Sequence, residues 1–122
     1  MNFPDDRKYN KSHEWVKELG NGLFEIGLSD YAQNELGDIV YVNLPQVGDE
    51  LREEEPFADV ESVKAVSDIV SPINGTVKEV NEQILSTPES INKTPYESWL
   101  IRAEGSVEKE LLSAEEYEKS LS

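Results

Sequence analysis

The chain has 122 residues, no cysteine, and a formal net charge of −15 from 26 acidic and 11 basic side chains. Phosphate backbones and anionic membranes bind basic side chains, so this acid excess argues against nucleic-acid and membrane partners. The missing cysteines exclude thiol catalysis and disulfides, and one histidine, His13, excludes His-rich metal sites. With no signal-peptide pattern or long apolar run, we expect a cytoplasmic, monomeric domain over residues 1–122 whose partners are proteins.

The predicted elements are mainly short strands separated by turns. Residues 1–12 show little periodicity and are expected to form a polar arm. Alternating and β-branched runs predict strands at 14–17, 23–28, 39–44, 57–62, 65–70, 76–80 and 99–103, and 47–51 is expected to be a turn into a short strand. Gly20-Asn21-Gly22 and Asn74-Gly75 are turn signals between these runs.

Three stretches favour helices. Ser29 or Asp30 is expected to cap a short helix over 31–36, which Gly37 ends. The segment between Pro88 and Pro95 is expected to be a loop or short helix. Ser113-Ala114-Glu115-Glu116 is a capping-box pattern for a last helix to about Leu121. The fold class is therefore mainly β, a flattened antiparallel β-sandwich or barrel, with a core at about 8–103 and a C-terminal helical segment at about 106–121.

Lys64 is an isolated cation at the end of an acidic stretch. From Glu18 to Val63 there are 12 acidic residues and one basic residue, Arg52. If the runs on either side of it pair, Lys64 lies with Val63 at a tight hairpin tip, although Val-Lys is poor turn chemistry. Such a departure from local rules favours a functional position, and an exposed lysine on a rigid tip suits acylation. The alternative is an ordinary exposed lysine. The run 53–55 is expected to be a solvated acidic face.

Several motifs resemble the glycine cleavage system H protein, a lipoyl-carrier family. The resemblance covers about Lys8 to Tyr117 in the family's order and spacing. The matching segments are Lys11-Ser12-His13-Glu14-Trp15-Val16, Asp30-Tyr31-Ala32-Gln33, Gly37-Asp38-Ile39-Val40-Tyr41-Val42-Asn43-Leu44-Pro45, Gly48-Asp49, Val60-Glu61-Ser62-Val63-Lys64-Ala65, Ser67-Asp68, Ser71-Pro72-Ile73-Asn74-Gly75, Val80-Asn81-Glu82, Asn92, Pro95-Tyr96 and Trp99. The Glu-Ser-Val-Lys-Ala string with its downstream Ser-Pro turn is highly specific.

The resemblance implies a lipoyl-carrier fold in which Lys64 carries lipoic acid in amide linkage. A lipoate ligase or lipoyl transferase would attach the group. A pyridoxal-phosphate glycine decarboxylase would then load an aminomethyl group onto the arm, and a tetrahydrofolate-dependent aminomethyltransferase would remove it. A flavin dihydrolipoamide dehydrogenase would reoxidise the arm. The chain itself is expected to be a non-catalytic carrier, because the chemistry belongs to the cofactor and the partners.

The resemblance also places the loaded arm against the segment 12–15. The carried amine is cationic, so a sheltering cleft should offer a carboxylate. Glu14 is the first candidate, with Ser12 and Asp68 as weaker ones; the alternative for Glu14 is a plain surface carboxylate. His13 lacks the nucleophile and second histidine that a catalytic base would need. Both tryptophans are expected to be core or cleft wall.

Other functions fit some of the same features. Lipoyl domains of 2-oxo-acid dehydrogenases usually carry Asp-Lys-Ala at the tip, and biotin carriers Met-Lys-Met, whereas Val63 and Ala65 flank the lysine here. A relay that passes lipoyl groups to other enzymes, or an unmodified lipoyl-like binding protein, stays open as an alternative. The segment Pro95-Tyr96-Glu97-Ser98-Trp99 is shorter than is usual in the family, which puts its local geometry in doubt.

Overall fold

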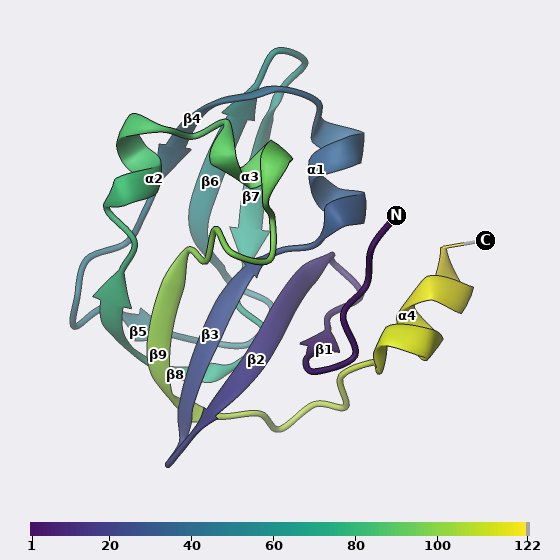
Figure 1. The fold of residues 1–122 in the computed structure, drawn as a ribbon. Coiled ribbons are helices and arrows are strands. Elements are labelled where there is room, and N and C mark those ends of the chain that lie inside the picture. Colours follow the sequence, from purple (N-terminus) through teal and green to yellow (C-terminus); the bar gives the residue numbers. More distant parts are fainter. Residues whose placement is uncertain (122) are drawn as a thin grey trace.

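The computed structural model describes residues 1–121 (Figure 1). The strands are β1 (Lys8–Tyr9), β2 (Glu14–Gly20), β3 (Leu23–Leu28), β4 (Ile39–Asn43), β5 (Glu50–Leu51), β6 (Pro56–Ser62), β7 (Val66–Val70), β8 (Asn74–Val80) and β9 (Ile101–Ser106). The helices are α1 (Asp30–Leu36), α2 (Gln83–Ser86), α3 (Ser90–Lys93) and α4 (Ala114–Ser120). No helix within the described range is long and apolar enough to cross a membrane.

These strands form two antiparallel sheets. Within residues 1–121 the larger sheet has six strands in the order β1-β2-β3-β9-β8-β5, and the smaller has three in the order β4-β6-β7. The β6–β7 hairpin projects at the top of Figure 1, beside α1. The chain ends with α4 packed beside β1, so the C-terminal segment lies close to the N-terminal strand.

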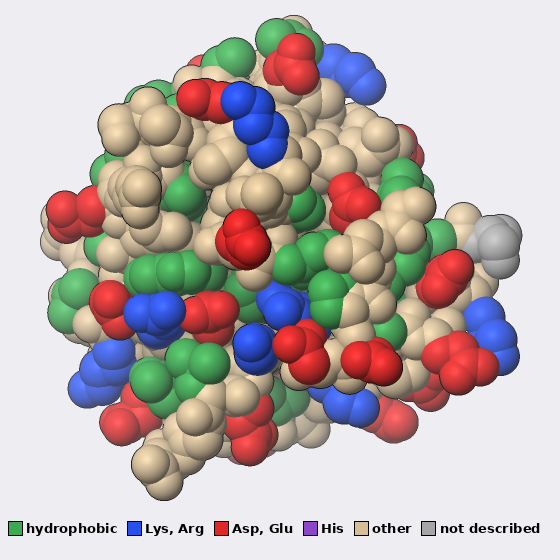
Figure 2. Space-filling view, viewed as in Figure 1, with side chains coloured by type: hydrophobic (Ala, Val, Ile, Leu, Met, Phe, Trp, Pro, Cys, Tyr) green, Lys and Arg blue, Asp and Glu red, His purple; other side chains and the backbone are tan. Residues whose placement is uncertain are grey.

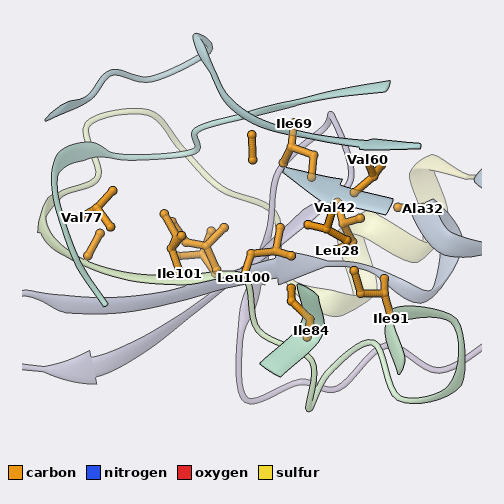
Figure 3. Close-up of a cluster of buried hydrophobic side chains, with 14 of the residues drawn as sticks. Leu28, Ala32, Val42, Val60, Ile69, Val77, Ile84, Ile91, Leu100 and Ile101 are labelled. Carbon is orange, nitrogen blue, oxygen red and sulfur yellow. The ribbon is translucent and has the colours of Figure 1, made fainter. Parts of the chain in front are cut away.

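The main core lies between the two sheets and under the short helices (Figure 3). Its fully buried members come from both sheets, because strands with one face inward place alternate residues in the core. Val42 and Val60 of the smaller sheet and Leu28 and Ile101 of the larger one all belong to it. Ile84 of α2 and Ile91 of α3 cover one side, as Figure 3 shows.

A second, aromatic core joins the two ends of the chain. Tyr9, Trp15 and Tyr117 are fully buried, and the rings of Tyr9 and Tyr117 stack at 4.7 Å between centroids. Tyr9 also exchanges two backbone hydrogen bonds of 2.8 Å with Leu112. Together these contacts fix α4 and the segment before it against β1.

The predicted fold class is confirmed: the protein is mainly antiparallel β, with short helices and a C-terminal helix. Ser113 and Glu116 form the expected capping box, and Ser29 caps α1 through its hydroxyl. Two expectations were wrong. Residues 1–12 are more than an arm, because Lys8–Tyr9 pairs with β2 as a two-residue strand too short for a periodicity signal. The last strand starts at Ile101, and residues 107–113 form an irregular segment before α4, with one bridge at Leu112.

Candidate functional site

Lys64 lies at the tip of the β6–β7 hairpin, as the sequence predicts. Glu61 of β6 is in register with Val66 of β7. The backbone N–H of Ser62 then donates to the carbonyl of Ala65 at 2.8 Å, which closes the turn. Val63 and Lys64 are its two central residues, and both are exposed. The turn therefore holds the lysine at the outermost point of the hairpin.

Ser62 stabilises the turn, for which Val63 and Lys64 are poor central residues. Its hydroxyl oxygen accepts from the backbone N–H of Lys64 at 3.1 Å and of Ala65 at 3.2 Å. Short polar side chains stabilise turns in this way by satisfying nearby backbone donors. The N–H of Val63 also donates to the carbonyl of Asp38 at 3.0 Å, which ties the tip to the start of β4. The tip is thus anchored although its lysine is exposed.

The Lys64 side chain lies toward α1. Its ammonium donates to the backbone carbonyl of Glu35 at 3.4 Å. Its stem passes over Gly37, where an added Cβ would lie 3.4 Å from the lysine Cε. Gly37 ends α1 with a φ of 80°, a conformation that glycine adopts without strain. The end of α1 therefore provides the surface over which the side chain leaves the tip.

A groove of about 200 Å³ opens next to this contact, between α1, β7 and the start of β2. Its apolar lining residues are Leu28, Ala32, Leu36, Val60 and Ile69. Its polar lining residues are Ser12, His13, Glu14, Glu35, Ser67 and Asp68. Lys64 contacts Glu35, one of these lining residues, so the tip and the groove form one continuous site. The three predicted cleft residues, Ser12, Glu14 and Asp68, all line this groove.

Glu14 is a buried carboxylate, only 2% exposed, and not the plain surface residue that was its alternative. Its Oε1 accepts from the Ser12 hydroxyl at 2.5 Å and from the Asn10 amide at 3.0 Å. Burial raises the pKa of Glu14, and the hydrogen bonds from Ser12 and Asn10 act against that rise. A buried carboxylate gains from a cation that enters the groove.

Ser12 and Asp68 contribute differently. Ser12 is exposed and orients Glu14 through its hydroxyl. Asp68 pairs in register with Asp59, which pairs with Asn43, and residues opposite each other share one face of a sheet. That face is the outer one, because the neighbouring positions Val42 and Val60 are buried in the core. The Asp68 carboxylate therefore lies at the rim rather than inside the groove.

His13 forms one wall of the groove and is held by hydrogen bonds. Its Nδ1 lies 2.8 Å from the Tyr117 hydroxyl, which lies 2.7 Å from the Ser29 hydroxyl. Burial lowers the pKa of His13. The ring therefore links α4 to the cap of α1 as a neutral group. Trp15 is core, while Trp99 is half-buried with the Arg102 guanidinium 4.0 Å above its ring.

The surface around the tip combines apolar and acidic residues. Four of the large hydrophobic side chains that are exposed in residues 1–121 lie on the hairpin or on β4: Val40, Tyr41, Val63 and Val66. Glu61 lies in the same cross-strand row as Tyr41 and Val66. Figure 2 shows hydrophobic, acidic and basic side chains side by side at this end of the molecule. Such exposed apolar patches commonly mark interaction surfaces.

Sequence reasoning missed Glu35, Asn10 and Lys109. Glu35 lines the groove, Asn10 binds Glu14, and Lys109 binds Asn10 at 2.6 Å. Glu35 lies near the end of the helix predicted at 31–36, and this position could have indicated it as a neighbour of the tip. Nothing local points to Lys109, because it lies 99 residues from Asn10.

The shortened segment at 95–99 is well anchored. The carbonyl of Pro95 accepts from the Trp15 indole N–H at 3.1 Å. The Tyr96 hydroxyl accepts from the Asp30 backbone N–H at 3.0 Å and donates to the Asn2 carbonyl at 2.7 Å. These contacts connect the segment to the start of α1 and to the N-terminus.

The site fits a lysine-linked lipoyl group. An exposed ammonium on a two-residue tip is accessible to an attaching enzyme without unfolding of the chain. The groove offers an apolar floor for a hydrocarbon chain and, at Glu14, a carboxylate for a cationic end group. These features define a small β-sandwich that presents one lysine at a hairpin tip beside an acid-lined groove.

Comparison with known proteins identifies the family of this chain. The model that describes the family named Glycine cleavage H-protein matches residues 7–122. A glycine cleavage system H protein from Lachnoclostridium phytofermentans is 54% identical over 120 residues, covering 98% of this chain and 94% of that one. One from Oceanobacillus iheyensis is 51% identical over 122 residues, covering 97% and 96%. The chain belongs to the glycine cleavage H-protein family.

A solved structure agrees with this assignment. The crystal structure of a glycine cleavage system H protein from Mycobacterium marinum superposes with a TM-score of 0.90 at 35% identity. The match covers 97% of this chain and 98% of that chain. The two proteins therefore share the same overall fold over nearly their whole lengths.

Proposed function

We propose that the chain is the lipoyl-carrying shuttle of a glycine cleavage system, with lipoic acid linked to Lys64 as an amide. An aminomethyl group from a pyridoxal-phosphate glycine decarboxylase would be carried to a tetrahydrofolate-dependent aminomethyltransferase on this arm. A dihydrolipoamide dehydrogenase then reoxidises it, and a lipoate ligase or lipoyl transferase attaches it. The observation that carries the proposal is the exposed Lys64 whose ammonium contacts Glu35 at the edge of the acid-lined groove.

When bound, lipoate supplies a disulfide-containing ring that accepts the aminomethyl group on sulfur and is restored by loss of two electrons and two protons. Everything else is supplied by this chain or by its partners. Ser62 and the Asp38 carbonyl hold the tip rigid while the enzymes act on the arm. Acylation removes the charge of Lys64 and takes the formal net charge from −15 to −16. The chain acts as a carrier and not as an enzyme.

Glu14 is proposed to hold the cationic amino group that the arm carries. Its carboxylate lies in the groove, and the Ser12 hydroxyl fixes one of its oxygens at 2.5 Å. Charge-assisted hydrogen bonds in a site shielded from water are stronger than those at the surface. The apolar floor formed by Leu28, Val60 and Ile69 limits the access of water to the carbon–sulfur link. Asp68, at the rim, adds negative potential where the arm enters.

The test is a reconstitution with defined partners. Lipoylated protein, glycine and a glycine decarboxylase are combined, and intact mass is followed. We expect one aminomethyl group per chain, which an aminomethyltransferase with tetrahydrofolate then removes. The same lipoylated protein with a 2-oxo acid and its decarboxylase should gain no acyl group. Acyl loading without aminomethyl loading would contradict the proposal in favour of a 2-oxo-acid dehydrogenase carrier.

The alternative of a lipoyl relay predicts a different result. A relay passes its lipoyl group to a second acceptor when a lipoyl transferase is supplied, and it needs no loading by glycine. Loss of the lipoyl mass to an acceptor domain, with no aminomethyl loading, would favour that role.

The cytoplasmic location and the monomeric state stay predictions.

A further inference from the structure

Lys109 connects the C-terminal segment to the groove. It lies in the irregular stretch 107–113 between β9 and α4, which β1 holds in place through the paired backbones of Tyr9 and Leu112. Its side chain is partly buried and turns toward the N-terminal segment, where it meets Asn10.

Two residues of the run 53–55 fix Lys109. Its backbone N–H donates to Glu53 Oε1 at 3.0 Å, and its ammonium pairs with Glu54. Glu53 is itself fixed, because its Oε2 accepts from the Asn74 amide at 2.8 Å. The expectation of a merely solvated acidic face was therefore wrong for Glu53, which is partly buried, whereas Glu54 is exposed as expected and also pairs with a distant segment of the chain. Their interactions aim the lysine at Asn10.

Lys109 also determines how the Asn10 amide is oriented. Asn10 Oδ1 accepts from the Lys109 ammonium at 2.6 Å and from the Lys11 backbone N–H at 3.1 Å. Both groups can only donate, so the oxygen must face them. The amide NH₂ then faces the other way, and it donates to the Ser12 hydroxyl at 2.9 Å and to Glu14 Oε1 at 3.0 Å. Reversing the amide would place donor against donor and oxygen against carboxylate.

We propose that Lys109 and Asn10 are positioning residues that hold the Glu14 carboxylate ionised and oriented for a primary ammonium group in the groove. The inference rests on the role proposed above for Glu14. Neither residue touches the ligand; each acts through the next, from Lys109 to Asn10 to Glu14. The C-terminal segment therefore serves the site although it lies outside the groove.

The charges around Glu14 explain why such support is needed. Burial raises its pKa, and the hydrogen bonds from Ser12 and Asn10 and the positive charge of Lys109 oppose that rise. The other titratable groups around the groove are Glu35 of α1, Asp68 of β7 at its rim, His13 and the Tyr117 hydroxyl of α4. Glu35 and Asp68 repel a second negative charge, while neutral His13 and Tyr117 add none. Lys109 is thus the cation that favours the charged form of Glu14.

The test measures the titration of Glu14 in the unmodified protein by carboxyl ¹³C NMR. In Lys109→Met, which keeps the length of the side chain, the Glu14 midpoint should move to higher pH. Asn10→Ala should move it in the same direction, and Lys109→Arg should restore most of the wild-type value. The matched control is Lys11→Met, because it removes an equal charge from an exposed side chain next to Asn10 but keeps the backbone donor.

An unchanged Glu14 midpoint in Lys109→Met, with the control also unchanged, would overturn the proposal. Glu54→Gln provides a milder version of the same test, since it loosens Lys109 without removing it, and should give a smaller shift of the same sign. Because these titrations need no lipoate and no partner enzyme, they succeed or fail independently of the proposed carrier function.

Discussion

The hydroxyl of Ser12 and the carboxylate of Glu14 meet at 2.5 Å, with the serine exposed and the glutamate almost fully buried. This hydrogen bond connects the exposed edge of the groove to a carboxylate buried inside the protein. It places an acceptor for a cation close to the point where a group carried on Lys64 would enter. The predictions below test what this arrangement does.

Glu14→Gln should shorten the lifetime of the aminomethyl group on the lipoylated protein about tenfold. The substitution preserves shape and an acceptor for Ser12 and Asn10, but it removes the charge that binds the ammonium. A hydrogen bond to a charged partner contributes about 1.5 to 3 kcal/mol, and the lower end of that range corresponds to about tenfold. Intact mass spectrometry over time measures the loss. Glu18→Gln, on the exposed end of β2, is the control and should leave the lifetime unchanged.

The same substitution should stabilise the fold near neutral pH. Burial holds the folded-state pKa of Glu14 above its value of 4.5 in the unfolded chain. The folded protein thus binds this proton more tightly, and its stability falls as pH rises through the folded-state pKa. The Glu14→Gln protein has no carboxyl group at this position, so this loss of stability with rising pH should be absent. Urea unfolding of both proteins from about pH 4 to about pH 8 should show the difference growing with pH. A difference that shrinks as pH rises would mean that the carboxylate is stabilising.

Ser62→Ala should loosen the tip. It removes the acceptor for the backbone N–H groups of Lys64 and Ala65, at a cost of about 1 kcal/mol in the free energy of unfolding. Attachment of lipoate should also slow, because the attaching enzyme then meets a less ordered hairpin. Ser62→Thr keeps the hydroxyl and should behave as wild type in both assays. Equal rates for Ser62→Ala and wild type would show that turn order does not matter for attachment.

Transfer between partners should slow as salt is added. A chain with a net charge of −15 steers toward basic docking surfaces, and charge complementarity mainly accelerates encounter. Screening shortens the range of that field, so the second-order rate of loading should fall between low and physiological ionic strength. If loading rates at limiting protein concentration do not depend on salt, the acidity serves solubility only.

The sequence predicted those parts of the site that depend on local chemistry. Lys64 at the tip, the Ser29 cap and the Ser113–Glu116 capping box all follow from neighbouring residues. The role of Ser62 as acceptor is also local. The burial of Glu14 is not, because it depends on elements that the fold brings together around the groove.

Longer-range contacts escaped prediction for the same reason. Tyr117 meets His13 across 104 residues of chain and Ser29 across 88, and no pattern of spacing indicates such pairs. Gly27 is another residue whose role depends on tertiary structure. A Cβ there would lie 2.5 Å from the Trp15 ring, so packing requires a residue without a side chain. These features depend on which strands become neighbours, which composition and periodicity do not determine.

The central claim is that Lys64 is the attachment point of the arm, and intact mass tests it most directly. Wild-type protein incubated with a lipoate ligase, ATP and lipoate should gain the mass of one lipoyl group and no more. Lys64→Ala should gain none, while Lys93→Ala, which removes an exposed lysine of α3, should gain one. A lipoyl group on the Lys64→Ala protein would contradict the account, because the arm would then be attached elsewhere.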